Sequence, residues 1–153
     1  MPPHLRDVID SDLPIFFEQQ NDEEANRMAA FPARARDAFF AHWQKILADA
    51  SGHQQTIVYA GQVAGYIVGF DRGREREVGY WLGRAFWGKG IASAALAAFL
   101  DIETTRPLTA FAAAHNLGSI RVLEKNGFRR VGAFLDIETL DAQPVEGVIF
   151  RLE

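Results

Sequence analysis

The sequence predicts an α/β domain in which helices flank a central mixed, mostly antiparallel sheet of six or seven strands. Two β-rich runs, residues 55–59 and 63–70, are joined by Ala60-Gly61-Gln62, which is typical of a tight hairpin. Further along, a strand (77–82), a helix (91–100) and a strand (108–113) follow one another, an order that indicates a parallel strand pair joined by a right-handed crossover. With 153 residues, 48% of them hydrophobic, the chain can bury one core, and we expect residues 1–153 to form a single domain.

Before the hairpin, the sequence predicts one short strand and two helices. Residues 5–9 form the candidate strand, and Ser11 or Asp12 is suited to cap the helix that follows. We expect residues 21–32 to form a mobile or irregular connection. The second helix covers residues 35–50, where four apolar side chains recur at helical spacing and are expected to face the core: Phe39, Trp43, Ile46 and Leu47.

After the hairpin, a turn at residues 71–74 leads into a third strand, residues 75–82, which completes an antiparallel set. Alternation along this strand divides its side chains between two faces, with Glu77, Gly79 and Trp81 on one and Val78, Tyr80 and Leu82 on the other. The helix over residues 91–100 is apolar nearly all round and rich in alanine, so we expect it to be buried against the sheet.

The last third of the chain predicts a strand, a helix and two more strands. Arg106-Pro107 breaks the chain before the strand at residues 108–113. Asn116 is suited to cap a helix over residues 117–126, and Gly127 is suited to end it. The final strands cover residues 128–135 and 145–152, with a turn at residues 141–144 between them.

Composition excludes several classes of protein. The chain has no cysteine, so disulfides, thiolate metal sites and a cysteine nucleophile are excluded. The N-terminus has no signal-peptide core and no run is long enough to span a membrane, so we expect a cytoplasmic protein with no membrane partner. Seven acidic residues and one basic residue lie in the first 24 positions, and no basic stripe follows. This pattern argues against a nucleic-acid partner, and it fits either a cationic acceptor or simply a solvated acidic helix.

The short segment Gly88-Lys89-Gly90-Ile91-Ala92 is a candidate anion site. It lies between a strand and the start of a helix, whose first N–H groups have no intrahelical acceptor and lie at the positive end of the helix dipole. Glycine lets the backbone approach a ligand closely, and Lys89 adds positive charge. The segment therefore fits a diphosphate, although an ordinary strand-to-helix turn with a solvated lysine has the same pattern.

A second motif, running from Asn116 through Ser119 to Gly127-Phe128, follows the first in the chain. Together the two motifs resemble the GNAT superfamily of N-acetyltransferases, and they are most similar to its branch of ribosomal-protein and small-molecule N-acetyltransferases. The resemblance covers about residues 55–134. It implies the GNAT fold, acetyl-CoA as co-substrate, and a primary amine as acceptor.

The resemblance also implies how acetyl-CoA is held. The backbone of Gly88, Lys89, Gly90, Ile91 and Ala92 binds the pyrophosphate. The pantetheine arm lies where the strand at residues 77–82 splays from the strand at residues 108–113, and backbone groups of both strands bind it much as another strand would. An amide near Leu82 is the candidate partner of the thioester oxygen.

Three side chains complete the candidate cofactor site. The superfamily often has Gln or Arg three residues before the first loop glycine, whereas this chain has Ala85 there and Arg84 one place earlier. Trp87 is a candidate to cover the cofactor or the pocket mouth. Asn116 resembles the asparagine that contacts pantetheine in the family, and helix capping is the alternative role.

Glu77 is the candidate general base, acting directly or through water, because it matches a strand position where the family often has a carboxylate. A partly buried glutamate can have its pKa raised toward the useful range. The alternative is a surface glutamate that pairs with Arg74 or Arg76.

Ser119 is the candidate partner of the CoA sulfur. Many members of the family have a tyrosine seven residues after the motif asparagine as the proton donor, but this chain has Leu123 there. A serine at position 119 matches the branch in which a serine hydrogen-bonds the thiol, and the alternative role is support of the first helical turn. Tyr80 lies next to the cofactor strand by pattern and is an alternative proton donor, but it is expected to pack in the core. His42, His53 and His115 show no metal-ligand spacing, so no metal is expected, and His115 is a weak acid/base reserve.

These motifs predict an acetyl-CoA-dependent N-acetyltransferase that moves an acetyl group directly to a protein N-terminus or a small-molecule amine. Leu123 keeps one alternative open, a non-catalytic acyl-CoA-binding regulatory module. A nucleotide-binding domain is a weaker alternative, because the loop lacks the fuller glycine-rich fingerprints. The sequence does not choose between a monomer and a homodimer.

Overall fold

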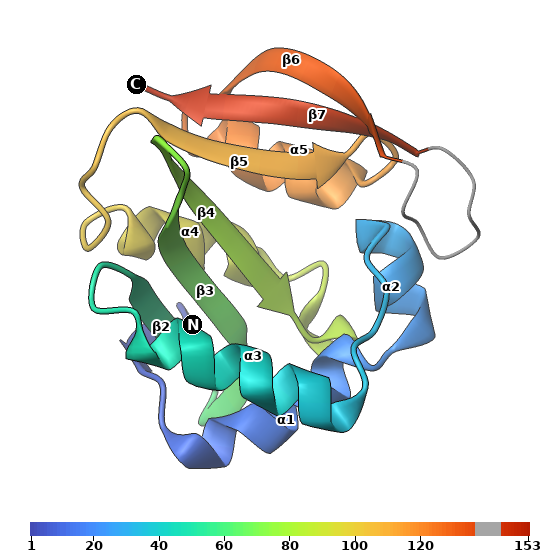
Figure 1. The fold of residues 1–153 in the computed structure, drawn as a ribbon, viewed down its shortest axis with the longest axis vertical. Helices are drawn as coiled ribbons and strands as arrows, with labels where there is room; N and C mark the ends of the chain where they lie inside the picture. Colours follow the sequence, from blue (N-terminus) through green and yellow to red (C-terminus); the bar gives the residue numbers. More distant parts are fainter. Residues whose placement is uncertain (137–144) are drawn as a thin grey trace.

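A seven-stranded mixed sheet runs through the computed structural model of the chain, which describes residues 1–136 and 145–153 (Figure 1). The strands are β1 (His4–Asp7), β2 (His53–Tyr59), β3 (Gln62–Arg72), β4 (Glu75–Leu82), β5 (Leu108–Ala113), β6 (Arg129–Asp136) and β7 (Val145–Leu152), in the order β1-β2-β3-β4-β5-β7-β6. Neighbouring strands are antiparallel except β4 and β5, which are parallel. The predicted α/β class and the crossover after β4 are confirmed.

Helices cover both faces of this sheet. Those of the described residues are α1 (Leu13–Gln20), α2 (Glu23–Ala29), α3 (Arg36–Ala48), α4 (Ile91–Phe99) and α5 (Leu117–Lys125), with short 3-10 turns at Asp10–Asp12 and Arg84–Phe86. In Figure 1, α1 and α3 lie in front of the sheet, whereas α4 and α5 lie behind it. None of these helices has the length and apolar character needed to cross a bilayer.

Strand alternation divides the interior into two hydrophobic cores. The rear core joins α4 and α5 to Ile67 of β3 and Val78 of β4. The front core joins α1 and α3 to Val68 of β3, with Phe39 and Trp43 buried as the helical spacing predicts. β3 thus contributes alternate residues to opposite cores, and both faces of the sheet are covered.

The hairpin between β2 and β3 confirms the turn predicted from sequence. Tyr59 pairs with Gln62, and the two residues between them have positive φ, 51° at Ala60 and 77° at Gly61. This is the conformation that lets a two-residue turn follow the twist of its strands. The next hairpin is equally tight, because Arg72 pairs with Glu75.

Several expectations for the N-terminal half were wrong. Residues 21–32 are not irregular, because α2 forms there and Asp22 caps it by accepting a hydrogen bond from the Glu24 N–H. Asp12 does occupy the N-cap position of α1, but its side chain does not cap the helix: its carboxylate accepts hydrogen bonds from Arg6, the Ile9 N–H and Thr56 instead of from the first turn of α1. For Asp12, partners brought close by the tertiary fold outweighed the local capping role, whereas Asp22 makes a local cap that the sequence analysis did not expect.

Helix α4 is less buried than expected. Ile91, Ala95, Leu96 and Phe99 are buried, whereas Ala94, Ala97 and Ala98 are exposed. One face therefore packs on the sheet, and the small alanine side chains let the other face meet solvent without a large apolar area. The turn expected at residues 141–144 lies outside the described residues.

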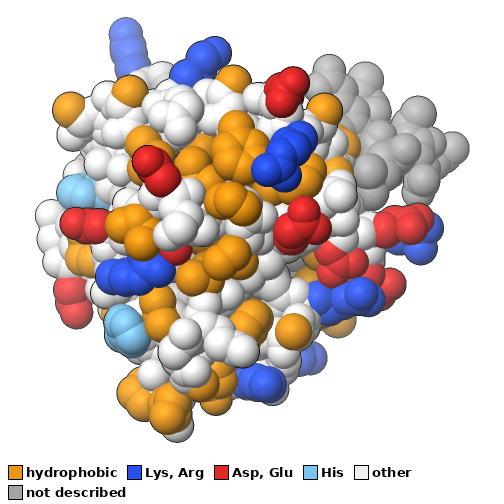
Figure 2. Space-filling model, turned by 90° about the horizontal axis from the view of Figure 1, so that it is seen from below, with side chains coloured by type: hydrophobic (Ala, Val, Ile, Leu, Met, Phe, Trp, Pro, Cys, Tyr) orange, Lys and Arg blue, Asp and Glu red, His pale blue; other side chains and the backbone are white. Residues whose placement is uncertain are grey.

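Figure 2 shows the molecule from below the view of Figure 1. Hydrophobic side chains gather along the middle of this face, and basic and acidic side chains are interspersed around them. No single sign of charge dominates this face.

Candidate active site

Strands β4 and β5 diverge soon after they begin, as Figure 1 shows. Among the described residues, only Arg76 with Leu108 and Glu77 with Thr109 are paired between them. The Gly83 N–H donates to the Ala64 carbonyl of β3 at 2.8 Å. Because successive residues of a strand point their N–H groups to opposite sides, the Leu82 N–H is directed to the β5 side, into the splay. The splayed strand pair expected from sequence is therefore present.

The segment after β4 forms a backbone cradle. Gly88 and Gly90 have φ of 75° and 74°, a region that glycine occupies readily and other residues rarely. A Cβ built on either glycine meets no atom within 4 Å, so both glycines face open space. Gly90 is also the N-cap residue of α4 and has no side chain with which to cap it, which leaves the first N–H groups of the helix available to an anion.

Side chains near the cradle have other partners as well. The Nε atom of Arg84 lies 3.0 Å from Oδ2 of Asp22, at the start of α2. The Lys89 Nζ atom lies 5.9 Å from the centre of the Tyr59 ring. The Trp87 indole Nε1 donates to the Leu82 carbonyl at 3.0 Å, so this side chain folds back on the end of β4. Arg84 thus links the cradle to α2, and Lys89 is the cradle's own cation.

Glu77 is buried at the point where β4 and β5 part. The residue is only 8% exposed, and burial raises the pKa of its carboxyl group. The Arg72 charge lowers this pKa and the Glu75 charge raises it, and the net shift is upward. Its Oε1 lies 2.9 Å from the Arg72 Nε, an ion pair whose alignment does not make a hydrogen bond. The alternative partners expected from sequence, Arg74 and Arg76, are wrong.

The register of the β3–β4 hairpin explains the choice of Arg72. Phe70 lies directly opposite Glu77, and Arg72 is two residues further on the same face of β3. The Arg72 guanidinium also lies 5.7 Å from the centre of the Phe111 ring of β5. Arg72 was not among the expected partners, although a two-residue turn at Gly73-Arg74 would have placed it in β3, on the same face as Glu77.

Tyr80 and Ser119 meet on the other side of β4. The Tyr80 hydroxyl lies 2.7 Å from the Ser119 Oγ, and burial raises the pKa of the phenol to about 12. Asn116 caps α5 as predicted, because its Oδ1 accepts a hydrogen bond from the Ser119 N–H at 3.2 Å. Leu123 is fully buried in the rear core. The expectation that Tyr80 only packs in the core was incomplete, because its hydroxyl bonds a candidate site residue.

His115, the remaining acid/base candidate, contacts α2. The Nε2 atom of His115 lies 2.9 Å from the Arg27 carbonyl of α2, so this histidine joins two elements. No group of three or more His, Cys, Asp or Glu side chains that could hold a metal ion occurs in residues 1–136 and 145–153. The arrangement thus offers an anion cradle, an open strand pair, a buried carboxyl group and two hydroxyl groups.

The chain is similar in sequence to known acetyltransferases. The family model described as acetyltransferase (GNAT) domain matches residues 4–129. The Bacillus subtilis (strain 168) protein named "Putative ribosomal N-acetyltransferase YdaF" is 33% identical over 109 residues. The match covers 66% of this chain and 59% of that relative, so it spans less than two thirds of the relative's length.

Solved structures share the whole architecture at low sequence identity. RimL, a ribosomal alpha-N-protein acetyltransferase solved with coenzyme A, superposes with a TM-score of 0.84 at 18% identity, covering 99% of this chain and 94% of that one. Spermidine N-acetyltransferase from Vibrio cholerae, solved with CoA and spermine, gives 0.80 at 17% identity, covering 97% and 95%. At these identities the likeness shows a shared fold.

Proposed function

Because this chain belongs to the acetyltransferase (GNAT) family, whose model matches most of its length, we propose that it transfers an acetyl group from acetyl-CoA directly to a primary amine. The observation that carries the proposal is the pair of glycines that open the N-terminus of α4 next to the splayed ends of β4 and β5. A diphosphate fits the first feature and an extended pantetheine arm fits the second.

In this proposal the cradle holds the CoA pyrophosphate. The open space beside Gly88 and Gly90 lets phosphate oxygens approach the backbone, and the N–H groups of Ile91 and Ala92 stand at the positive end of the α4 dipole. Lys89 adds a full positive charge. The Asp22 partner of Arg84 reduces what that arginine can offer to a phosphate, so the backbone and Lys89 are the main determinants.

The splay provides backbone groups for the rest of the donor. The Leu82 N–H points into the gap, where it can donate to the thioester oxygen and to the oxyanion that forms when an amine attacks the carbonyl. The Trp87 indole supports this geometry, because it occupies the Leu82 carbonyl and ties the cradle to the strand end. Holding donor and acceptor side by side is the main contribution expected of such a site.

Glu77 is the proposed general base. It is paired with Thr109 at the last position before the strands part, so its carboxyl group lies where the gap begins. Burial raises its pKa toward neutral pH, which suits a group that must take a proton from an ammonium, and the exposed Arg72 beside it favours the ionised form. The amine nitrogen loses two protons overall: one passes through Glu77 to solvent, and the other ends on the CoA sulfur.

Ser119 is the proposed hydrogen-bond donor to that sulfur. It lies in the first turn of α5, on the opposite side of β4 from Glu77, and Asn116 fixes its backbone. Proton removal from the amine and stabilisation of the leaving thiolate are then tasks of different residues. Fully buried Leu123 offers no polar group to share the second task.

The acceptor is proposed to be a small-molecule amine or a protein N-terminus. Relatives are named for acting on both kinds of amine, a ribosomal protein and spermidine, and each name describes that relative alone. The aromatic pair of Phe111 and Phe134, with ring centres 5.7 Å apart, lies beside Arg72 on the Glu77 face and is the proposed apolar wall of the acceptor site.

Calorimetric titration with acetyl-CoA tests the donor site, with ATP as the competing diphosphate and CoA as the deacetylated control. A thiol-release assay against small amines and peptides with free N-termini then tests transfer. Binding of acetyl-CoA and CoA without ATP, followed by thiol release on one class of amine, is the expected result. Failure to bind acetyl-CoA would refute the cradle, and binding without turnover on a broad panel would refute the proposed transfer.

A further inference from the structure

Two hydroxyl groups from distant parts of the chain meet at the splay. Tyr80 of β4 and Ser119 of α5 are 39 positions apart, yet their side-chain oxygens lie 2.7 Å from each other. The Tyr80 oxygen also lies 3.4 Å from the Ser119 backbone carbonyl, a much longer contact. The Tyr80 ring packs against the rear core, so β4 holds the phenol firmly and presents its hydroxyl to the start of α5.

Either oxygen can donate in this hydrogen bond, and the chemistry of the two groups favours one direction. Each hydroxyl has one hydrogen to donate, but a phenol is the stronger acid and hence the better donor. A phenol is protonated at neutral pH, and burial raises the pKa of Tyr80 further, to about 12. When Tyr80 donates, the Ser119 oxygen accepts, and the Ser119 hydrogen is left for a different acceptor.

The backbone around Ser119 limits where that hydrogen can go. The Asn116 Oδ1 accepts from the Ser119 N–H at 3.2 Å, and the Ile120 N–H donates to the Asn116 carbonyl at 3.1 Å, which together hold the first turn of α5 in place. With one side of the Ser119 oxygen facing Tyr80, the hydroxyl rotor has fewer orientations than that of a solvated serine.

We propose that Tyr80 is a positioning residue, which donates to the Ser119 oxygen and thereby directs the Ser119 hydroxyl hydrogen to the CoA sulfur. The proposal rests on the donor role of Ser119 described above. As the C–S bond breaks, its electron pair stays on sulfur, and the oriented hydroxyl stabilises the resulting thiolate until the sulfur takes the proton released by the attacking nitrogen. Tyr80 keeps its own proton throughout.

Single and double hydroxyl deletions test this arrangement in the full chain. We expect Tyr80→Phe to lower kcat about three- to tenfold and Ser119→Ala about ten- to 100-fold, in line with one neutral and one charge-assisted hydrogen bond. The affinity for acetyl-CoA, measured by calorimetry, should change less than about twofold in both, because the contacts lie at the reacting end of the donor and act mainly in the transition state. The matched control is Tyr66→Phe, whose ring packs between Phe16 and Trp43 in the front core and which should keep the wild-type kcat.

The double variant distinguishes positioning from independent or merely structural roles. If Tyr80 acts only through Ser119, the kcat of Tyr80→Phe/Ser119→Ala equals that of Ser119→Ala within about twofold. Multiplied effects in the double variant, or an unchanged kcat in either single variant of an active enzyme, would overturn the proposal. An inactive wild-type protein on a broad amine panel would instead refute the proposed transfer, and the role of Tyr80 with it.

Discussion

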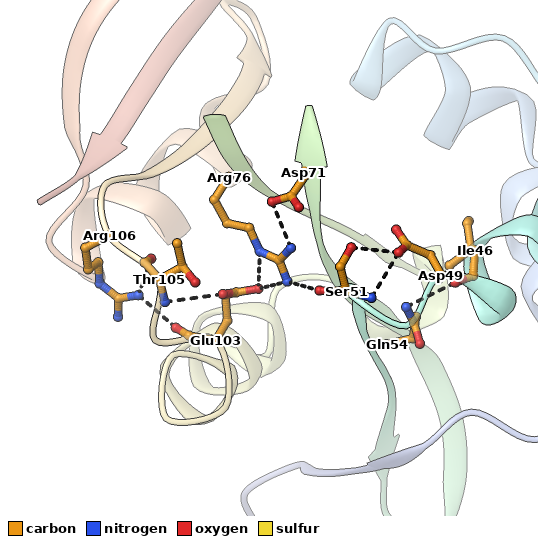
Figure 3. A network of polar contacts seen from close by, with 9 residues as sticks. All are labelled: Ile46, Asp49, Ser51, Gln54, Asp71, Arg76, Glu103, Thr105 and Arg106. Atoms are coloured by element: carbon orange, nitrogen blue, oxygen red, sulfur yellow. Dashed lines mark hydrogen bonds and ion pairs between the residues drawn. The ribbon is translucent and has the colours of Figure 1, made fainter. Parts of the chain in front are cut away.

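Loss of the Arg76 side chain should be the most destabilising single change in the polar part of this fold. Figure 3 shows its guanidinium at the centre of a network that joins β4 to the segment before β5. The Nε atom donates to Oε1 of Glu103 at 2.8 Å, and the remaining nitrogens reach Asp71 at 3.1 Å and the Ser51 carbonyl at 2.8 Å. Arg76 is 7% exposed and Glu103 is fully buried.

The magnitude follows from what Glu103 would retain. In Arg76→Met its carboxylate keeps only the Thr105 N–H, at 3.4 Å, among the described contacts to its side chain. Removing one partner of a buried ion pair leaves an uncompensated charge, which typically costs about 3–5 kcal/mol. For a domain stable by about 5–15 kcal/mol, this is a large share of the free energy of unfolding. The melting temperature should fall by about 6–20 °C.

Urea unfolding followed by tryptophan fluorescence measures the effect. The matched control is Arg27→Met, which removes an ion pair of 2.6 Å whose side chains are 64% and 79% exposed, and which should change stability by less than about 1 kcal/mol. The double variant Arg76→Met/Glu103→Leu removes both buried charges and should recover most of the loss.

Two results would refute this reasoning. A loss below about 1 kcal/mol in Arg76→Met would mean that water reaches the Glu103 carboxylate and replaces the arginine. Additive losses in the double variant would mean that packing, and not the unpaired charge, sets the cost.

Three further predictions concern Glu77, Gly90 and Asp12. Glu77→Gln should lower kcat roughly 10²–10⁴-fold. It should also raise stability at pH 7, because burial raises the folded-state pKa of Glu77 and the ionised carboxylate therefore destabilises the fold above its unfolded pKa. In urea unfolding, the free energies of unfolding of the two proteins should become equal below about pH 4. Gly90→Ala places a Cβ on a residue with φ of 74° in the open cradle, so it should lower stability by about 1–2 kcal/mol. It should also weaken acetyl-CoA binding measured by calorimetry. A loss of stability with unchanged binding would count against the cradle. Asp12→Asn should lower stability at neutral pH, because burial raises the pKa of Asp12 but its hydrogen bonds, led by that from Arg6, lower the pKa by more. This stabilisation is present above the unfolded-state pKa and is lost as pH falls through the folded-state pKa. A stability difference between the two proteins that stays constant at all pH values would contradict this explanation.

Local patterns in the sequence were enough to predict much of this fold. The glycines at 88 and 90, the cap at Asn116 and the hairpin at Ala60-Gly61 depend on backbone conformations that a few neighbouring residues determine. The strand–helix–strand order around α4 then requires the parallel pairing of β4 with β5. These features carry the donor half of the candidate site.

Polar partners that are distant in sequence could not be predicted in the same way. Helix α2 forms in a segment without a strong apolar period, where Asp22 provides a cap and an ion pair with Arg84 in the cradle. Asp12 was expected to cap α1, but Arg6 and Thr56 bind its carboxylate once β1 and β2 are paired. The Asp22–Arg84 ion pair and the partners of the Asp12 carboxylate both depend on neighbours that packing provides.

The sequence by itself determined the α/β class, the strand–helix–strand order around α4, the glycine segment of the candidate cradle and the identity of the carboxyl and hydroxyl candidates. Only the tertiary structure decided that Glu77 pairs with Arg72 and that Tyr80 holds Ser119. The physical reason is that backbone conformation depends on neighbours along the chain, whereas the charge and orientation of a side chain depend on the strands and helices that packing brings beside it. The order of the elements can therefore be predicted from the sequence. The charge and orientation of the candidate groups Glu77, Tyr80 and Ser119 can be described only when β3, β4 and α5 are packed together.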